Sequence, residues 1–142
     1  METGYGQTMP AHRTNHRVRF HELDPYDHVN HAMYVTYFEI GRVDALDAVE
    51  LGLDILKTEG FQFVVTKVEV RFRMAATAGD DLVISTGVAK FGRASTIWQQ
   101  EIHRGDDRIA SAEVTVAVTD RAGKPVRPEP HIFERLESIA LT

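Results

Sequence analysis

The spacing of apolar and polar residues predicts four strands in the second half of the chain. From Val64 to Met74, apolar residues at every second position alternate with mostly charged ones, which is the period of a strand with one apolar face. Three further strands are expected over residues 82–90, 94–104 and 109–120. Short turns containing glycine separate these segments, so consecutive strands are expected to run antiparallel.

A short strand is predicted just before the turn at Asp24. Val18 and Phe20 alternate there with polar neighbours, as in a half-buried strand. Residues 1–14 carry no apolar period and are expected to form a mobile tail. A single domain is therefore expected over residues 15–142.

A long helix is predicted over about His31–Leu51, where apolar residues recur at helical spacing and no proline interrupts them. Asn30 is suited to the N-cap of this helix, and Gly52 stands where the helix is expected to stop. Gly41 lowers the helix propensity locally but would permit close packing on a sheet. The segment from Pro128 onward is expected to add a final helical turn or two.

The order of elements is strand, helix and then four strands. This order predicts an α+β fold in which an antiparallel sheet of about five strands packs on one long helix. At 142 residues the chain fits one domain, and 43% hydrophobic residues suffice for a core without covalent cross-links. The absence of cysteine excludes disulfide bonds, thiolate metal sites and a cysteine nucleophile.

Charge and hydropathy narrow the choice of partners. The 16 basic and 21 acidic residues give a net charge of −5, which disfavours a broad surface for nucleic acids or anionic membranes. The first residues lack the apolar stretch of a signal sequence, and no later apolar run approaches the length of a membrane span. We therefore expect a cytoplasmic protein with neither a nucleic-acid nor a membrane partner.

The connection between the first strand and the long helix concentrates the candidate catalytic side chains. Its polar residues are Asp24, Asp27, His28, Asn30 and His31. The unpaired N–H groups and the dipole at a helix N-terminus favour negative charge, so a carbonyl held there would be polarised as it becomes an oxyanion. A neighbouring carboxylate could act as a general base on water or attack directly. Asp24 is our candidate for this carboxylate, and Asp27 is its rival.

Other interpretations of this connection stay open. Aspartate and asparagine before a helix are also ordinary capping residues. His28 and His31 could be imagined as metal ligands together with the two aspartates. The chain lacks the HExxH spacing, the GxSxG elbow of serine hydrolases and a dinucleotide-binding glycine pattern. We therefore expect neither a metal nor a cofactor.

The stretch Asp24–Glu39, with a His-Val-Asn run followed by Tyr and then Phe-Glu, resembles the loop and helix start of hotdog-fold thioesterases of the 4-hydroxybenzoyl-CoA thioesterase superfamily. Residues 71–73 and 78–82 resemble that family's strand and following Gly-Asp turn. The resemblance covers roughly residues 15–135. It implies a hotdog fold, with the sheet wrapped on a central helix, and hydrolysis of an acyl thioester, most simply acyl-CoA, without metal or cofactor.

The resemblance also implies roles for individual residues. Asp24 would be the nucleophile or general base, and backbone N–H groups near Asn30 and His31 would hold the thioester oxygen. His28 and Asn30 would orient the attacking water or the carbonyl. Glu39 is the alternative carboxylate of another branch of the family, or else a solvated or intersubunit helix residue. Further residues expected at the substrate are Tyr26, Asp27, Val29 and Tyr34. The chain departs from the family pattern at residues 26–27, where many members have glycine.

The phosphates of a coenzyme A substrate require local cations. Four candidates lie on or between predicted strands: Arg71, Arg73, Lys90 and Arg93. The alternative is a solvated, charged face of the sheet.

One helix on one face leaves the other face and the edges of the sheet open. The resemblance implies that the chains pair through their sheets into a homo-oligomer, a dimer or tetramer, with sites formed between subunits. Phe61, Phe63 or Val65 of one subunit would then reach the acyl pocket of another, or else pack in the core.

Three other functions compete with acyl-CoA hydrolysis. The acyl group could be carried by an acyl-carrier protein instead of coenzyme A. The same fold could hydrate or dehydrate an enoyl or 3-hydroxyacyl thioester, with Asp24 and His28 as the catalytic pair. A non-catalytic module that binds acyl thioesters is the third alternative.

Overall fold

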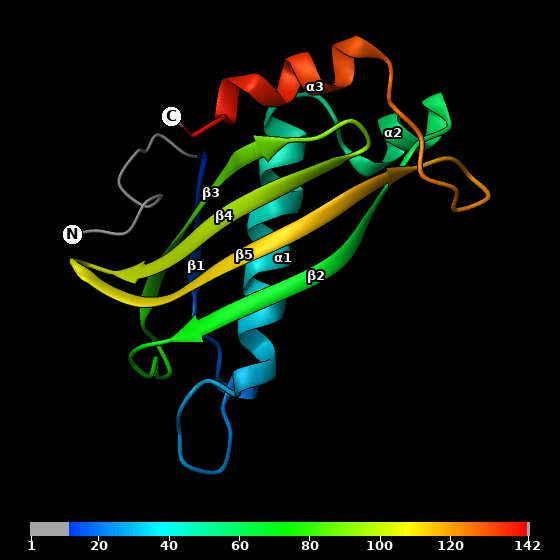
Figure 1. The fold of residues 1–142 in the computed structure, drawn as a ribbon. Coiled ribbons are helices and arrows are strands. Elements are labelled where there is room, and N and C mark those ends of the chain that lie inside the picture. The colour runs from blue at the N-terminus through cyan, green and yellow to red at the C-terminus, as the bar shows by residue number, and fades with distance from the viewer. Residues whose placement is uncertain (1–11, 142) are drawn as a thin grey trace.

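The computed structural model describes residues 12–141 (Figure 1). The elements, in chain order, are β1 (His12–Arg17), the 3-10 turn η1 (Phe20–Glu22), α1 (His31–Ala48), α2 (Leu53–Glu59), β2 (Gln62–Phe72), β3 (Asp81–Phe91), β4 (Ser95–Arg104), β5 (Asp107–Thr119), α3 (Pro130–Leu136) and the 3-10 turn η2 (Glu137–Ile139).

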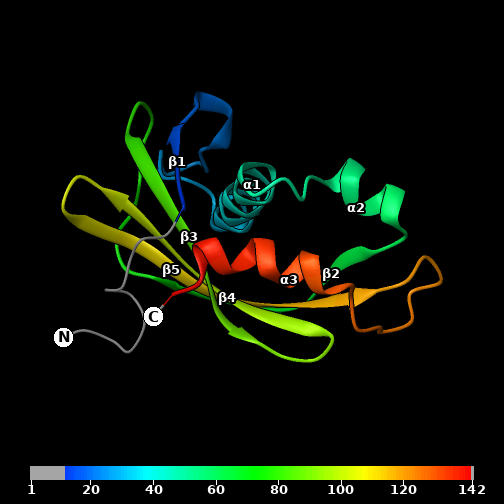
Figure 2. The same cartoon turned by 90° about the horizontal axis from the view of Figure 1, so that it is seen from above.

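The five strands form one antiparallel sheet in the order β1-β3-β4-β5-β2. Figure 2, which views the molecule along α1, shows the sheet curving around this helix. The predicted α+β fold with an antiparallel sheet on one long helix is therefore confirmed. Within the described residues, no helix combines the length and the apolar character that crossing a membrane requires.

The core lies between α1 and the inner face of the sheet. Tyr37 and Phe38 on the helix are fully buried, as is Ile84 on β3. Gly41 makes the contact close, because a Cβ at this position would stand 2.7 Å from both Ile84 Cγ2 and Thr86 Oγ1. The glycine that weakens the helix in isolation is thus required where the helix meets the sheet.

The first strand differs most from the prediction. It begins at His12 instead of near His16, so residues 12–14 of the expected tail belong to the sheet, and residues 1–11 lie outside the described residues. Phe20, expected to face the core, begins a 3-10 turn and is 84% exposed. The prediction placed this strand too late because the inward side chains of β1 are polar and bind carboxylates: His12 and Thr14 contact Asp44, and His16 contacts Glu22.

The long helix ends earlier than predicted. It stops at Ala48, and Glu50 follows in the left-handed conformation with φ 62°. Gly52, expected just past the helix end, is instead the N-cap of α2, an element that the prediction did not include. The final helical turns expected after Pro128 are present as α3 and η2.

The two edges of the sheet differ in how they are covered. The outer side of β3 pairs with β1 along its first half, and farther on the Leu141 N–H bonds to the Val88 carbonyl at 2.8 Å. No strand in the described part of the chain pairs with the outer edge of β2. Large hydrophobic side chains are exposed along and just after β2: Val64, Val65, Val68, Phe72 and Met74.

Candidate active site

The connection between η1 and α1 is a closed, hydrogen-bonded loop. Leu23 and Val29 form an antiparallel bridge, and the Asp24 N–H donates to the His28 carbonyl at 2.7 Å. Asp24 is half-buried, and its Oδ1 accepts the backbone N–H groups of Tyr26 at 2.8 Å and His28 at 3.2 Å. Within the described residues Oδ2 of Asp24 has no hydrogen-bond partner. The carboxylate therefore shapes the loop with one oxygen and keeps the other available for chemistry.

The start of α1 supplies one unengaged backbone donor. Asn30 is the N-cap, as predicted, and its Oδ1 accepts the Ala32 N–H at 2.9 Å. The N–H of Asn30 itself donates to the Glu22 carbonyl at 3.0 Å. The His31 N–H has no acceptor in the described part of the chain. Of the two amides expected to hold a thioester oxygen, only that of His31 is thus unoccupied.

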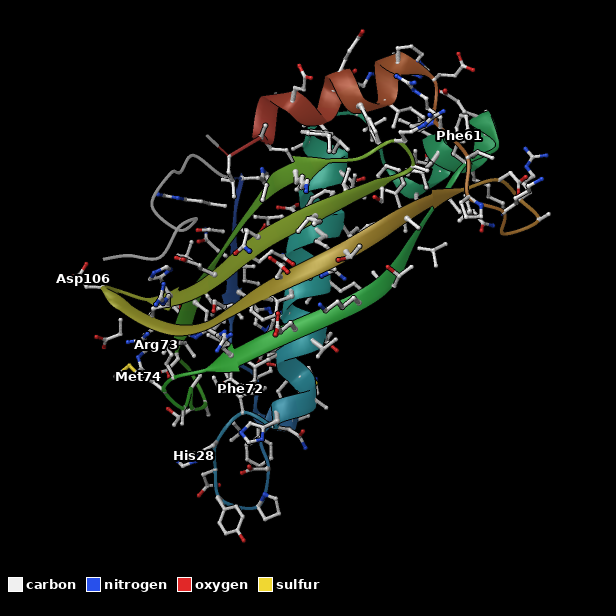
Figure 3. The ribbon with its side chains drawn as sticks, in the orientation of Figure 1. His28, Phe61, Phe72, Arg73, Met74 and Asp106 are labelled. Carbon is white, nitrogen blue, oxygen red and sulfur yellow. The ribbon has the colours of Figure 1, made fainter. Side chains whose placement is uncertain are left out.

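The tip of the loop is open to solvent. Asp27 has φ 64°, in the left-handed region that favours glycine. Tyr26 is 80% exposed and His28 is exposed as well, and Figure 3 shows His28 projecting from the loop. A surface pocket of about 360 Å³ lies beside them, lined by Phe20, Leu23, Tyr26, Asp27, His28, Thr77 and Ala78.

Two residues expected at the substrate belong to the core instead. Val29 and Tyr34 are each 2% exposed, and the Tyr34 hydroxyl accepts the Ala76 N–H at 3.3 Å. The Ala76 carbonyl in turn accepts the Val29 N–H at 2.8 Å. Both residues therefore hold the end of the loop against the β2–β3 connection, and neither is accessible in this chain.

The C-terminal end of β2 reaches the start of α1. The ring of Phe72 lies 4.6 Å from that of His31 and 5.3 Å from that of Tyr34, measured between centroids. Phe72 is 47% exposed, so it forms part of the surface next to the loop. The resemblance included Phe72 only within a strand motif, and its contact with His31 depends on tertiary structure that local spacing does not reveal.

A buried carboxylate, Glu22, stands immediately before the loop. Its side chain is nearly inaccessible, and its Oε1 accepts hydrogen bonds from the Tyr37 hydroxyl at 2.7 Å and the Arg19 N–H at 2.9 Å. His16 Nε2 lies 3.2 Å from the same oxygen. Sequence reasoning missed this residue because glutamate next to a polar loop carries no sign of burial.

Hydrogen bonding keeps Glu22 charged. Burial on its own would raise the pKa of this carboxyl, but hydrogen bonds from Arg19, Tyr37 and His16 outweigh burial and hold the pKa below its ordinary value. The pKa of the Tyr37 hydroxyl is raised by burial and by its bond to the Glu22 carboxylate. Tyr37 is therefore a proton donor to Glu22 throughout the physiological range.

The remaining predicted residues lie away from the loop. Glu39 is on the exposed side of α1, eight residues and about 12 Å of helix rise beyond His31. Burial lowers the pKa of Arg42, and the charge of Glu39 partly offsets this effect. Lys90 and Arg93 are exposed at the β3–β4 hairpin, at the end of the sheet opposite the loop (Figure 1).

Arg71, near the end of β2, and Arg73, just after it, are exposed, and Figure 3 shows Arg73 on the side of the sheet nearest the loop. They line a surface groove of about 630 Å³ that also contains Arg108 and the three acidic residues Glu69, Glu101 and Glu113. The groove is therefore mixed in charge. Among residues 12–141, no group of three or more histidine, aspartate or glutamate side chains is placed to hold a metal ion.

Comparison with known proteins relates this architecture to a family. The model of the Thioesterase-like superfamily matches residues 18–136. The long-chain acyl-CoA thioesterase FadM of Escherichia coli strain K12 is 28% identical over 130 residues, which cover 89% of this chain and 98% of FadM. The acyl-CoA thioester hydrolase YbgC of Escherichia coli O6:H1 is 29% identical over 120 residues, which cover 84% of this chain and 87% of YbgC.

A solved structure shows the same fold. A thioesterase of Thermus thermophilus, complexed with coenzyme A and Zn, superimposes with a TM-score of 0.79 at 25% identity, covering 89% of this chain and 92% of that one. This likeness confirms the hotdog fold expected from the resemblance. The family match runs from Val18, just after β1, to the last residue of α3, and includes the whole loop. The chain therefore belongs to the Thioesterase-like superfamily.

Proposed function

We propose that this chain hydrolyses acyl-CoA thioesters to the free acid and coenzyme A. The observation that carries the proposal is the presence of two complementary groups at one loop: the Asp24 Oδ2 atom and the His31 N–H at the start of α1, neither of which has a hydrogen-bond partner among residues 12–141. The first can act as a base or nucleophile, and the second can donate to a developing oxyanion. The superfamily match and the activities named for FadM and YbgC support acyl-CoA as the substrate class.

In the proposed reaction the thioester carbonyl oxygen binds at the His31 N–H, where the positive end of the α1 dipole adds to the hydrogen bond. Asp24 takes a proton from a water molecule, and the hydroxide adds to the carbonyl carbon. The tetrahedral intermediate collapses with cleavage of the C–S bond, and the departing thiolate receives the proton from Asp24. The alternative, direct attack by Asp24 Oδ2, passes through a mixed anhydride that water then cleaves.

Two neighbours of Asp24 complete the proposed site. The His28 backbone N–H donates to Asp24 Oδ1, and the exposed imidazole is proposed to orient the attacking water. Asn30 uses Oδ1 to cap α1, so only its side-chain NH2 group remains for the substrate carbonyl. Asp27 and Glu39 stay the alternative carboxylates.

We further propose that two chains pair through the free edges of β2. This edge, Gln62–Phe72, pairs with no other strand among the described residues, and exposed valines and Phe72 lie along it. An antiparallel pairing around a two-fold axis would bring the end of each β2 next to the beginning of the other. Since Phe72 contacts His31 at the loop, each loop would then lie beside the start of the partner's β2. A dimer follows from this pairing, and a dimer of dimers would require a second interface.

The start of β2 borders an apolar pocket of about 420 Å³. It is lined by Leu53, Leu56, Lys57, Phe61, Gln62, Phe63 and Arg121. Figure 3 shows Phe61 at the end of the sheet opposite His28, so within one chain the pocket is remote from the loop. In the proposed dimer, Phe61 and Phe63 would line the acyl pocket of the partner's site, as the sequence led us to expect.

The cation candidates for the phosphates of coenzyme A remain proposals. Arg71 and Arg73 adjoin the loop of their own chain, whereas Lys90 and Arg93 would have to act on a ligand at the other end of the sheet. A cytoplasmic location likewise remains a prediction.

The test is the release of free thiol from short, medium, long and aromatic acyl-CoAs, with acyl-carrier-protein thioesters in a parallel series. We expect hydrolysis of at least one acyl-CoA. Hydrolysis of carrier-protein thioesters alone would show that the substrate is an acyl-carrier protein and not acyl-CoA. If no thioester is hydrolysed but an enoyl-CoA is hydrated, the protein is a hydratase. Binding of acyl-CoA without any turnover would identify a binding module.

A further inference from the structure

The proposed reaction makes no use of Glu22, although its environment is unusual for a glutamate. The residue is only 5% exposed, and a carboxylate removed from water to that extent is costly unless hydrogen bonds compensate for its burial. Three donors from three segments converge on one oxygen, Oε1: His16 on β1, the Arg19 N–H before η1, and Tyr37 on α1. The Glu22 side chain thus connects β1, the residue before η1, and α1 at the point where the loop begins.

The backbone of Glu22 is tied to the loop as well. Its carbonyl accepts the Asn30 N–H at 3.0 Å, and the bridge between Leu23 and Val29 follows directly. One residue therefore bonds the first end of the loop to its last end through the main chain. Through its side chain, the same residue bonds to Tyr37, which lies seven residues beyond the N-cap of α1.

We infer that Glu22 is a positioning residue, which fixes the Asp24 carboxylate relative to the His31 N–H by bonding the loop to α1 through Tyr37. This inference rests on the proposed function, because it concerns the geometry of the same site. The Asp24 carboxylate belongs to the loop, whereas the His31 N–H belongs to the helix. The position of the carboxylate relative to this N–H group therefore depends on the hydrogen bonds that connect the loop to α1. A displacement of about 1 Å between two such groups can cost on the order of 100-fold in rate.

A second carboxylate that joins β1 to α1 provides a matched control. Asp44 on α1 accepts a hydrogen bond from Thr14 Oγ1 at 2.7 Å, and His12 Nε2 lies 2.8 Å from the same oxygen. The pKa of Asp44 is lowered chiefly by these hydrogen bonds from His12 and Thr14. It lies seven residues, about 10 Å of helix, beyond Tyr37, and its hydrogen-bond partners among the described residues are on β1, not in the loop.

The test compares Glu22→Gln, Glu22→Ala and Tyr37→Phe with Asp44→Asn in steady-state kinetics, well below the melting temperature of each variant. We expect Glu22→Ala to lower kcat about 30-fold while KM changes less than about twofold, since the ground-state contacts of the substrate are intact. Glu22→Gln keeps an acceptor for Tyr37 and is expected to recover most of this loss. Tyr37→Phe should lower kcat about fivefold, with little further loss when combined with Glu22→Ala. Asp44→Asn is expected to lower the melting temperature but leave kcat unchanged.

Amide hydrogen exchange provides a measurement that does not require turnover. The Asn30 and His28 N–H groups are expected to exchange at least about tenfold faster in the Glu22→Ala and Tyr37→Phe variants, to change less in Glu22→Gln, and to exchange at the parental rate in Asp44→Asn. If the parent protein releases no thiol, the proposed function is wrong. Amide hydrogen exchange would still show whether Glu22 holds the loop against α1. Equal effects of Glu22→Ala and Asp44→Asn on kcat and on loop exchange would overturn the inference, as would a parental rate of loop exchange in Tyr37→Phe. If Glu22→Ala does not fold, Tyr37→Phe still decides the question, because it removes the same hydrogen bond.

Discussion

The hydroxyl of Tyr37 donates a 2.7 Å hydrogen bond to the carboxylate of Glu22, inside the protein and 15 residues away along the chain. Because this hydrogen bond is buried, removing the Tyr37 hydroxyl would leave the Glu22 carboxylate inside the protein with one hydrogen-bond donor fewer. We expect Tyr37→Phe to lower the free energy of unfolding by about 1–3 kcal/mol. Urea denaturation measures this change. Tyr26→Phe, at an 80% exposed position, is the control and should stay within about 0.5 kcal/mol of the parent.

Glu22 also predicts how stability responds to acid. The pKa of this carboxyl lies below its ordinary value of 4.5 in the folded chain, so under acid conditions the unfolded chain binds more protons. The stabilisation is present above pH 4.5 and is lost as the pH falls through the lowered folded pKa. Between about pH 5 and 3, denaturation of Glu22→Gln should therefore depend less on pH than that of the parent. Parallel pH profiles for the two proteins would contradict this account.

Asp27 occupies a backbone conformation better suited to glycine. At φ 64° a side chain meets the carbonyl that follows it, a cost that aspartate bears better than most residues. We expect Asp27→Gly to leave the free energy of unfolding unchanged or raise it by up to about 1 kcal/mol. The β-branched replacement Asp27→Val should lower it by about 1–2 kcal/mol. Thermal unfolding of both variants measures the difference, and the reverse order would show that the loop does not hold this conformation.

Gly41 separates helix propensity from packing. Alanine is a better helix former by about 1 kcal/mol, but its Cβ would stand 2.7 Å from Ile84 and Thr86 on the sheet. We expect the clash to dominate, so that Gly41→Ala lowers the free energy of unfolding by about 1–3 kcal/mol. The exposed residue Thr36, on the same helix, provides the contrast, because Thr36→Ala gains propensity without a clash. A stabilised Gly41→Ala variant would refute the close approach of α1 to β3.

The free edge of β2 predicts an association that charge can disrupt. Val68 is 36% exposed on this strand, and a glutamate there would place charge against charge across the proposed two-fold axis. We expect the parent chain to sediment as a dimer or tetramer and Val68→Glu to shift toward the monomer. Ile40→Glu, at a position on α1 that is likewise 36% exposed, is the comparison. A monomeric parent chain at micromolar concentration would exclude the proposed pairing.

The parts of the molecule that the sequence predicted well are those specified by local chemistry. The four later strands follow from alternation with short turns, and the N-cap of α1 follows from Asn30, whose side chain bonds two residues ahead. The boundaries that were missed depend on distant partners. β1 turns histidine and threonine inward because Glu22 and Asp44 receive them, and no local period reveals such pairing.

The same distinction between local sequence and distant contacts holds for the candidate site. Asp24, His28, Asn30 and His31 could be grouped from the sequence because one short loop contains them all. The occupation of the Asn30 N–H by the Glu22 carbonyl could not be predicted, and neither could the burial of Tyr34, since both depend on how the loop folds back. The motif therefore indicates where the proposed site lies, while the tertiary contacts indicate which of its atoms have no partner among the described residues.

We propose that the Asp24 carboxylate drives thioester hydrolysis. The most direct test is the rate at which the Asp24→Asn variant releases thiol from the best acyl-CoA substrate. Asparagine keeps an oxygen for the Tyr26 and His28 N–H groups but is neither a base nor an effective nucleophile. We predict a fall in kcat of at least about 100-fold with the loop intact, against less than about fivefold for Asp27→Asn and Glu39→Gln. Near-parental turnover by Asp24→Asn, or loss of turnover in Glu39→Gln instead, would contradict the account.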